Sequence, residues 1–279
     1  MLAVCFGGYV LGAAGGLVFW RREKMANLAA FGSAALAALA GLVACASALA
    51  TGAAAAKESV TLLPALLPFV RFELRLDALG LFFGLIISLL GVALSIYSLG
   101  YARGFYGRKN VGGLGALFNL LLLSATLVFL ANQVFFFLMA WEIMALVIYC
   151  LVNFEHEQQE TRAAGLLYFV MSHIGTGCLI LGFLLLAQAA GTYDFGSFHG
   201  LGAALSPGKR MAVFCLFLVG FGVKAGIVPL HVWLPAAHPV APSNVSALMS
   251  GVLIKTGIYG LTRVCFDFLG APPNWCGVT

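Results

Sequence analysis

The chain has 279 residues, of which 62% are hydrophobic and only 9% are charged. Because a soluble domain has about a quarter of its residues charged, this composition excludes a water-soluble fold. The formal charge of +5 does not indicate nucleic-acid binding, since the Lys and Arg residues form no basic stripe and lie at the ends of apolar runs. The seven cysteines include no C-x-x-C pair, so we predict no metal, iron–sulfur or other cofactor site and no catalytic residues.

Eight apolar runs follow one another along the chain, each close to the roughly 20 residues that a transmembrane helix needs. They cover residues 2–20, 25–50, 78–101, 113–130, 134–152, 163–190, 211–230 and 245–266. We therefore predict an all-α integral membrane protein with about eight transmembrane helices. The loops predicted on alternate sides differ slightly in their content of Lys and Arg, and this bias predicts an N-terminus outside the cell.

The first run carries three glycines, Gly8, Gly12 and Gly16, at four-residue spacing. This spacing predicts a smooth stripe against which a second helix packs closely. The alternative is a chance match in a helix rich in glycine.

Prolines interrupt the chain between the seventh and eighth runs, and we expect Pro229 and Pro235 to break the seventh helix. Non-helical backbone at membrane depth is tolerated only where it is buried in protein or lines a watery cavity. Broken helices are also where transporters commonly bind ions. The segment between these runs is therefore the first candidate for a functional site.

Three ionisable residues lie far from the end of any apolar run: Glu142, Lys224 and Lys255. Each costs about 2.5 to 3.5 kcal/mol on insertion scales, so such residues mark an ion pathway or a buried pair. One interpretation is a static Glu142–Lys224 ion pair with Lys255 bound to backbone carbonyls. Two lysines for one carboxylate favour the other interpretation, in which a lysine changes its protonation and carries protons.

Histidines near these charges are candidate proton relays. His231 and His238 lie in the proline-rich segment, and His173 lies in the sixth run. Because histidine titrates near neutral pH, each can pass protons on. The alternative is that they only form hydrogen bonds to the backbone.

Three stretches of sequence resemble a known family of membrane subunits. They are RLDALGLFF from Arg75, FFFLMAWEIMAL around Glu142, and GFGVKAGIVPLHVWLPAAHPVAPSNVSALMSGVLIKTGIYGL from Gly220 to Leu261. They are similar to the antiporter-like subunits of respiratory complex I, of Mrp-type sodium/proton antiporters, and of hydrogenase-4 and formate hydrogenlyase. AWEIMAL, together with MSHIGTG around His173, most resembles the hydrogenase-4 branch.

The resemblance implies roles for the three buried charges. In this family a glutamate on helix five pairs with a lysine on a broken helix seven, and a residue on helix eight passes the proton onward. These roles fall on Glu142, Lys224 and Lys255 in turn.

The resemblance also implies a division of the chain into an N-terminal segment of three helices (1–111, with an outer loop at 51–77), a first antiporter-like repeat of helices four to eight (112–266) and a short tail (267–279). Family members usually have a second repeat, which we do not find here, so we expect a truncated subunit or a half-subunit.

The function that follows from the resemblance is proton translocation within a redox-driven complex of the hydrogenase-4 or NADH:quinone oxidoreductase type. The subunit would be non-catalytic, would hold no redox cofactor, and would have other membrane and peripheral subunits of that complex as partners. We expect it in the cell (inner) membrane of a bacterium or archaeon. An Mrp-type monovalent cation/proton antiporter subunit is the alternative, and an inert scaffold is a third.

Overall fold

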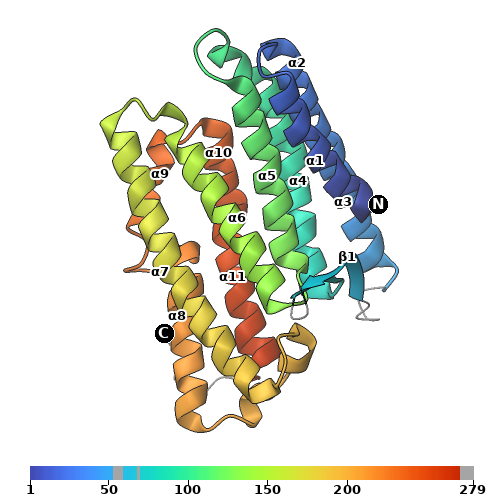
Figure 1. Cartoon of the computed structure of the whole chain (residues 1–279), viewed down its shortest axis with the longest axis vertical. Coiled ribbons are helices and arrows are strands. Elements are labelled where there is room, and N and C mark those ends of the chain that lie inside the picture. Colours follow the sequence, from blue (N-terminus) through green and yellow to red (C-terminus); the bar gives the residue numbers. More distant parts are fainter. Residues whose placement is uncertain (53–58, 68–69, 271–279) are drawn as a thin grey trace.

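The computed structural model describes residues 1–52, 59–67 and 70–270 of the chain, and most of them are helical (Figure 1). The α-helices are α1 (Leu2–Val18), α2 (Glu23–Asn27), α3 (Ser33–Ala50), α4 (Ala78–Tyr101), α5 (Val111–Leu130), α6 (Val134–Val152), α7 (Gln159–Ala190), α8 (Pro207–Ala225), α9 (Trp233–Val240), α10 (Ser243–Leu248) and α11 (Ile254–Thr262). Segments of π-helix join α2 to α3, join α10 to α11, and extend α11: Leu28–Gly32, Met249–Leu253 and Arg263–Phe268. The chain is therefore a bundle of long helices connected by short turns.

Six helices in the described part of the chain are long and apolar enough to cross a membrane. They are Glu23–Ala50, Ala78–Phe105, Val111–Leu130, Val134–Glu155, Gln159–Ala190 and Ser243–Phe268. The helix α1 is shorter but apolar, and α8 has 19 residues with three basic side chains among them. These eight helices follow the order of the eight predicted runs, which confirms the predicted membrane fold.

A β-hairpin is the main departure from the predicted all-helical fold. It consists of β1 (Ser59–Leu67) and β2 (Val70–Arg75), which pair antiparallel. In β2, apolar residues alternate with charged ones, which is the period of a strand with one buried face. The predicted outer loop at 51–77 thus carries regular structure, and Figure 1 places it at the end of the bundle opposite α2.

Glycines set the closest contacts between helices. A side chain at Gly12 would collide with the Asn119 amide of α5, and one at Gly16 would collide with the Gly112 carbonyl. Gly8 faces Ala37 of α3 in the same way. The predicted packing stripe on α1 is confirmed, because α5 and α3 both lie against it.

Candidate functional site at the broken helix

The buried lysine of the site is Lys224, which lies in the last turn of α8 and is only 1% exposed. Its ammonium group donates hydrogen bonds to the Tyr168 hydroxyl at 2.7 Å and to the Ser172 hydroxyl at 2.9 Å, both on α7. Nζ also lies 4.8 Å from the ring centre of Tyr168 and 5.5 Å from that of Trp141. Two hydroxyls and two aromatic faces therefore stabilise the cation.

Hydroxyl partners allow Lys224 to change its protonation state. An ammonium group only donates hydrogen bonds, whereas a hydroxyl both donates and accepts. A neutral Lys224 amine can thus accept a hydrogen bond from Tyr168 or Ser172 without any rearrangement of the site. A carboxylate partner would instead hold the proton on the lysine, because it favours the charged form alone.

The end of α8 is set by Gly226, whose φ of 71° is the left-handed conformation that commonly terminates helices. The indole N–H of Trp233, at the start of α9, donates to the Val223 carbonyl at 2.7 Å. This hydrogen bond satisfies one of the carbonyls that a helix end leaves without a partner. The aromatic ring of Trp233 also packs on Tyr168, with ring centres 5.2 Å apart.

The predicted break in helix seven is present, but its boundaries differ from those expected. The helix ends at Ala225, five residues before the predicted end at Leu230. Pro229 lies in the turn between α8 and α9, whereas Pro235 lies in the first turn of α9, where a missing N–H does no harm. Gly226, more than either proline, decides where the helix stops.

Glu142 of α6 contacts His173 of α7, with Oε2 and Nε2 3.2 Å apart. The other ring nitrogen, Nδ1, lies 2.9 Å from the Phe169 carbonyl and must donate to it, because a carbonyl oxygen only accepts. The contact at Nε2 is then favourable only if a proton lies on the ring or on the carboxyl group. The Glu142–His173 pair therefore holds one exchangeable proton.

A direct ion pair between Glu142 and Lys224 is expected from the resemblance and from the static interpretation, but it is not formed. Among the described residues, no carboxylate oxygen lies within 4.0 Å of Lys224 Nζ. Successive residues of an α-helix point about 100° apart. Trp141 faces Lys224, and Glu142, the next residue, is thereby directed toward His173.

The two groups are nevertheless close neighbours in the bundle. Trp141 and Ser172 both contact Lys224, and the residues that follow them on α6 and α7 are Glu142 and His173. The Glu142–His173 pair thus lies at about the same depth in the bundle as Lys224, because each of its members directly follows a residue that contacts the lysine. Glu142 is therefore near enough for its charge to act on Lys224.

Lys255 lies at the start of α11 and is half-buried. Its ammonium group donates to the Ser250 carbonyl at 2.7 Å, inside the preceding π segment, which is the kind of backbone contact that the static interpretation expects. The helix α11 packs closely on α8, because a side chain at Gly257 would collide with the backbone of Ala225 and Phe221. Lys224 and Lys255 therefore lie on adjacent helices.

The two histidines of the segment after the break differ in their contacts. His238 Nδ1 lies 2.9 Å from the Ser246 hydroxyl, while its Nε2 is buried without a hydrogen-bond partner in the described part of the chain. His231 Nδ1 is also buried and has no partner among those residues. Neither histidine contacts Lys224 or Lys255 directly, again within the described ranges.

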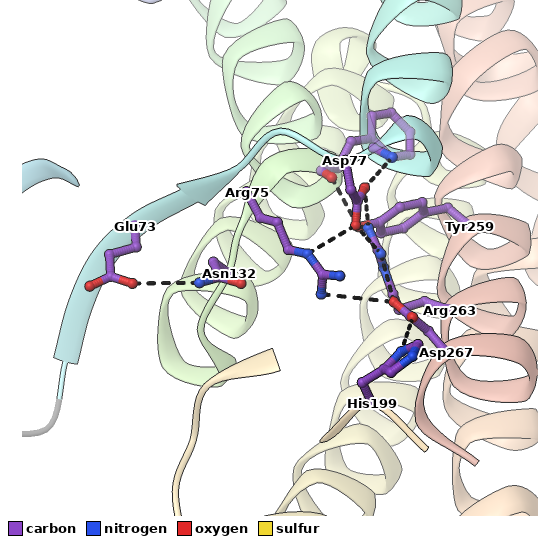
Figure 2. Close-up of polar contacts among 10 residues, drawn as sticks. Glu73, Arg75, Asp77, Asn132, His199, Tyr259, Arg263 and Asp267 are labelled. Carbon is purple, nitrogen blue, oxygen red and sulfur yellow. Dashed lines mark hydrogen bonds and ion pairs between the residues drawn. The ribbon is translucent and has the colours of Figure 1, made fainter. Parts of the chain in front are cut away.

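A second polar cluster lies at the end of the bundle near β2, and Figure 2 shows it. Arg263, in the π segment after α11, forms a two-pronged ion pair with Asp77, the residue that caps the start of α4. The same guanidinium donates to Asp267 at 2.8 Å and to the Tyr259 hydroxyl at 2.9 Å. Arg263 is buried, so these contacts replace its water of solvation.

The cluster extends to the hairpin and to the surface. Arg75 of β2 lies 3.2 Å from Asp77 and 3.8 Å from Asp267, and the exposed ring of His199 lies 2.7 Å from Asp267. Although burial opposes ionisation of Asp77, hydrogen bonds from Arg263 and from the Gly80 N–H, with the charges of both arginines, hold its pKa below the usual value. The charges in this cluster are therefore fixed.

The residues around these charges were not predicted from the sequence. Tyr168, Ser172 and Thr176 lie four residues apart on α7 and face inward, and this polar stripe in an apolar run was the available signal. Arg263 and Asp267 share the same spacing. In the part of the chain that the structure describes, no three His, Cys, Asp or Glu side chains are grouped so as to hold a metal ion.

A helical membrane bundle with a broken helix and a buried lysine at the break has the architecture of an antiporter-like membrane subunit. The chain belongs to the NADH:quinone oxidoreductase/Mrp antiporter transmembrane family, whose model matches residues 131–278. It is 42% identical to hydrogenase-4 component B of Escherichia coli over 212 residues, which are 75% of this chain and 31% of that protein. It is 30% identical to NADH-quinone oxidoreductase subunit N of Deinococcus radiodurans, over 74% of this chain and 42% of that subunit.

Solved structures share the fold. A chain of the membrane-bound sulfane sulfur reductase, an archaeal respiratory membrane complex, matches with a TM-score of 0.78 and 20% identity, over 99% of this chain and 55% of that one. A chain of the Mrp complex from Dietzia matches with a TM-score of 0.76 and 20% identity, over 96% of this chain and 49% of that one. This chain therefore spans about half or less of each of these relatives.

Proposed function

We propose that the chain is a proton-translocating membrane subunit of a redox-driven complex of the hydrogenase-4 or NADH:quinone oxidoreductase type. The observation that carries the proposal is Lys224, a fully buried amine that has two hydroxyl partners at the end of a broken helix. Such a site lets the amine gain and lose a proton in place. The chain itself contributes no redox chemistry, and partner subunits carry the electrons.

In the proposed mechanism, Lys224 is the proton carrier and the Glu142–His173 pair controls it. When the pair gives up its proton, its negative charge favours the ammonium form of Lys224. When the pair takes up a proton, that attraction is lost and Lys224 releases its own proton toward Lys255 on the adjacent helix. His231 and His238 are proposed relays near the break, because each has one buried ring nitrogen without a hydrogen-bond partner among the residues that the structure describes.

Sodium transport by an Mrp-type antiporter subunit is the alternative, and the chemistry around Lys224 argues against it. Sodium, like other hard cations, is bound by oxygen ligands that include carboxylates. An ammonium group in the same position repels a metal cation. We therefore favour protons as the transported ion, in a prokaryotic cell membrane with the N-terminus outside.

The test is proton translocation by the assembled complex in inverted membrane vesicles with Lys224→Arg and Lys224→Ala. Both variants should abolish translocation, because an arginine keeps the charge but does not release its proton. Lys209→Arg, at the exposed start of α8, is the matched control and should translocate normally. Translocation at the wild-type rate by Lys224→Arg would overturn the proposal.

Lys255 is tested in the same vesicles. If it receives the proton, Lys255→Arg and Lys255→Ala should both stop translocation while protein abundance stays unchanged. A Lys255→Arg variant that still pumps would show that this position needs only a positive charge.

A further inference from the structure

A pocket of about 410 Å³ is lined by residues of α2 and of the end of α4. In Figure 1, α2 lies at the end of the bundle opposite the hairpin. This volume is within the range of pockets that bind small ligands, roughly 300 to 1,000 Å³. Its walls come from α2, from the π segment that follows it, from the last turn of α4, and from the 3-10 turn after α4 with the next residue: Lys24, Asn27, Leu28, Leu99, Arg103 and Tyr106. No residue of the Lys224 site contributes to it.

Two basic side chains in this pocket have no acidic partner. Lys24 and Arg103 are both exposed, and in the described ranges neither lies within 4.0 Å of a carboxylate. The surrounding sequence is also basic: residues 20–24 and 102–108 hold five Lys or Arg residues and one Glu. The pocket therefore attracts an anion.

The side-chain oxygen of a buried asparagine in the same pocket lacks a hydrogen-bond partner among the described residues. Asn27 is 3% exposed, and its Nδ2 donates to the Leu99 carbonyl at 3.0 Å and to the Tyr106 hydroxyl at 2.8 Å. The Leu99 carbonyl can only accept, so the amide orientation is fixed. Asn27 Oδ1 is left buried without a hydrogen-bond partner in the described chain, and a buried acceptor of this kind is normally satisfied by a donor from water or from a ligand.

The remaining walls are apolar and lie toward the lipid. Leu28 is largely exposed and begins the π segment that follows Asn27, and Leu99 lies across from it on α4. Single π turns within helices are frequent at functional sites. A ligand in this pocket would meet cations, one hydrogen-bond acceptor and hydrocarbon together.

We propose that this pocket binds the headgroup of an anionic glycerophospholipid that carries a hydroxyl group, such as phosphatidylglycerol. The phosphate lies between Lys24 and Arg103, a headgroup hydroxyl donates to Asn27 Oδ1, and the acyl chains run along the leucines. Basic pockets between transmembrane helices recognise lipid phosphates through this combination of charges.

Native mass spectrometry of the full chain in detergent tests the proposal. Phosphatidylglycerol is titrated against the wild type and against the double variant Lys24→Ala/Arg103→Ala, which should bind about tenfold more weakly because it lacks both phosphate contacts. The control is Arg21→Ala/Arg108→Ala, which removes two basic residues from the same end but outside the pocket walls, and should change affinity less than about twofold. The charge-preserving variant Lys24→Arg/Arg103→Lys should keep its affinity, while circular dichroism checks the fold.

Three results would overturn the lipid site. An equal loss of affinity in the two alanine double variants would mean that only diffuse charge attracts the lipid. Equal binding of phosphatidylcholine would remove the anionic selectivity. Displacement of the lipid by an equal concentration of inorganic phosphate would make free phosphate the ligand.

Discussion

The two buried charge sites of this protein are built on opposite principles. At the broken helix, the buried cation Lys224 contacts hydroxyls and aromatic rings, and no carboxylate among the described residues pairs with it. Near the hairpin, the cations Arg75 and Arg263 are each paired with the carboxylates of Asp77 and Asp267. Arginine keeps its proton in proteins, whereas lysine can lose it. We infer that the hairpin cluster is structural and that the site at the break is a place where charge changes.

The largest expected effect is on stability, in the hairpin cluster. Arg263→Ala leaves the buried carboxylate of Asp77 and the half-buried carboxylate of Asp267 without their main partner, and should lower the free energy of unfolding by about 3 to 5 kcal/mol. Thermal unfolding in detergent measures the loss. Arg263→Lys is the control and should lose less of the free energy of unfolding, because lysine keeps the charge although it cannot form the two-pronged contact. A stable Arg263→Ala protein would show that the cluster does not hold α11 to α4.

The second prediction concerns the control of Lys224 by the Glu142–His173 pair. Glu142→Gln removes a negative charge that acts on the lysine, and we expect proton translocation to fall about tenfold. His173→Gln should have a similar effect, and the double variant should be no worse than either single variant if the two act as one unit. Translocation in vesicles is the measurement, with Glu155→Gln as the control. Fully additive losses would mean that the residues act independently.

The third prediction is that acid weakens the hairpin cluster. The pKa of Asp77 is lowered in the folded chain, so its contribution to stability is complete above the pKa of an unfolded aspartate, about 3.9, and is lost as the pH falls through the lower folded value. Melting temperatures measured from pH 7 to pH 3 should therefore fall in acid. Asp77→Asn should remove this part of the pH dependence. An unchanged acid slope in that variant would assign the effect to other groups.

The features that could be predicted from the sequence are those that depend only on local stretches of the chain. Helix number and order follow from apolar runs, because the length needed to cross a bilayer is a local property of the chain. Glu142, Lys224 and Lys255 were identifiable for the same reason, since a charge within an apolar run is visible in one dimension. The division at residues 111 and 266 stays a prediction.

The partners of those charges could not be predicted, because they depend on how the helices are rotated against one another. Glu142 contacts His173 instead of Lys224 since adjacent residues point in different directions, and sequence spacing alone does not fix which one faces the lysine. The pairing of Asp77 with Arg263 joins residues 186 positions apart. Only the packed bundle determines such contacts.

The smallest expected effect is the change in the free energy of unfolding when Lys224 of the broken-helix site is replaced. This prediction distinguishes the site most clearly from the hairpin cluster. Lys224→Met replaces the amine with an apolar side chain of similar length and removes a buried cation that costs the fold energy. It leaves no charged group without its partner, because the hydrogen-bond partners of Lys224 are neutral hydroxyls. The free energy of unfolding should therefore stay within about 1 kcal/mol of the wild type or rise, in contrast to the loss expected for Arg263→Ala. Thermal unfolding of both variants in one detergent makes the comparison, while the vesicle assay verifies that Lys224→Met has lost translocation. If Lys224→Met were as unstable as Arg263→Ala, the lysine would be a structural element of the bundle, and the distinction between a fixed and a changing charge site would fail.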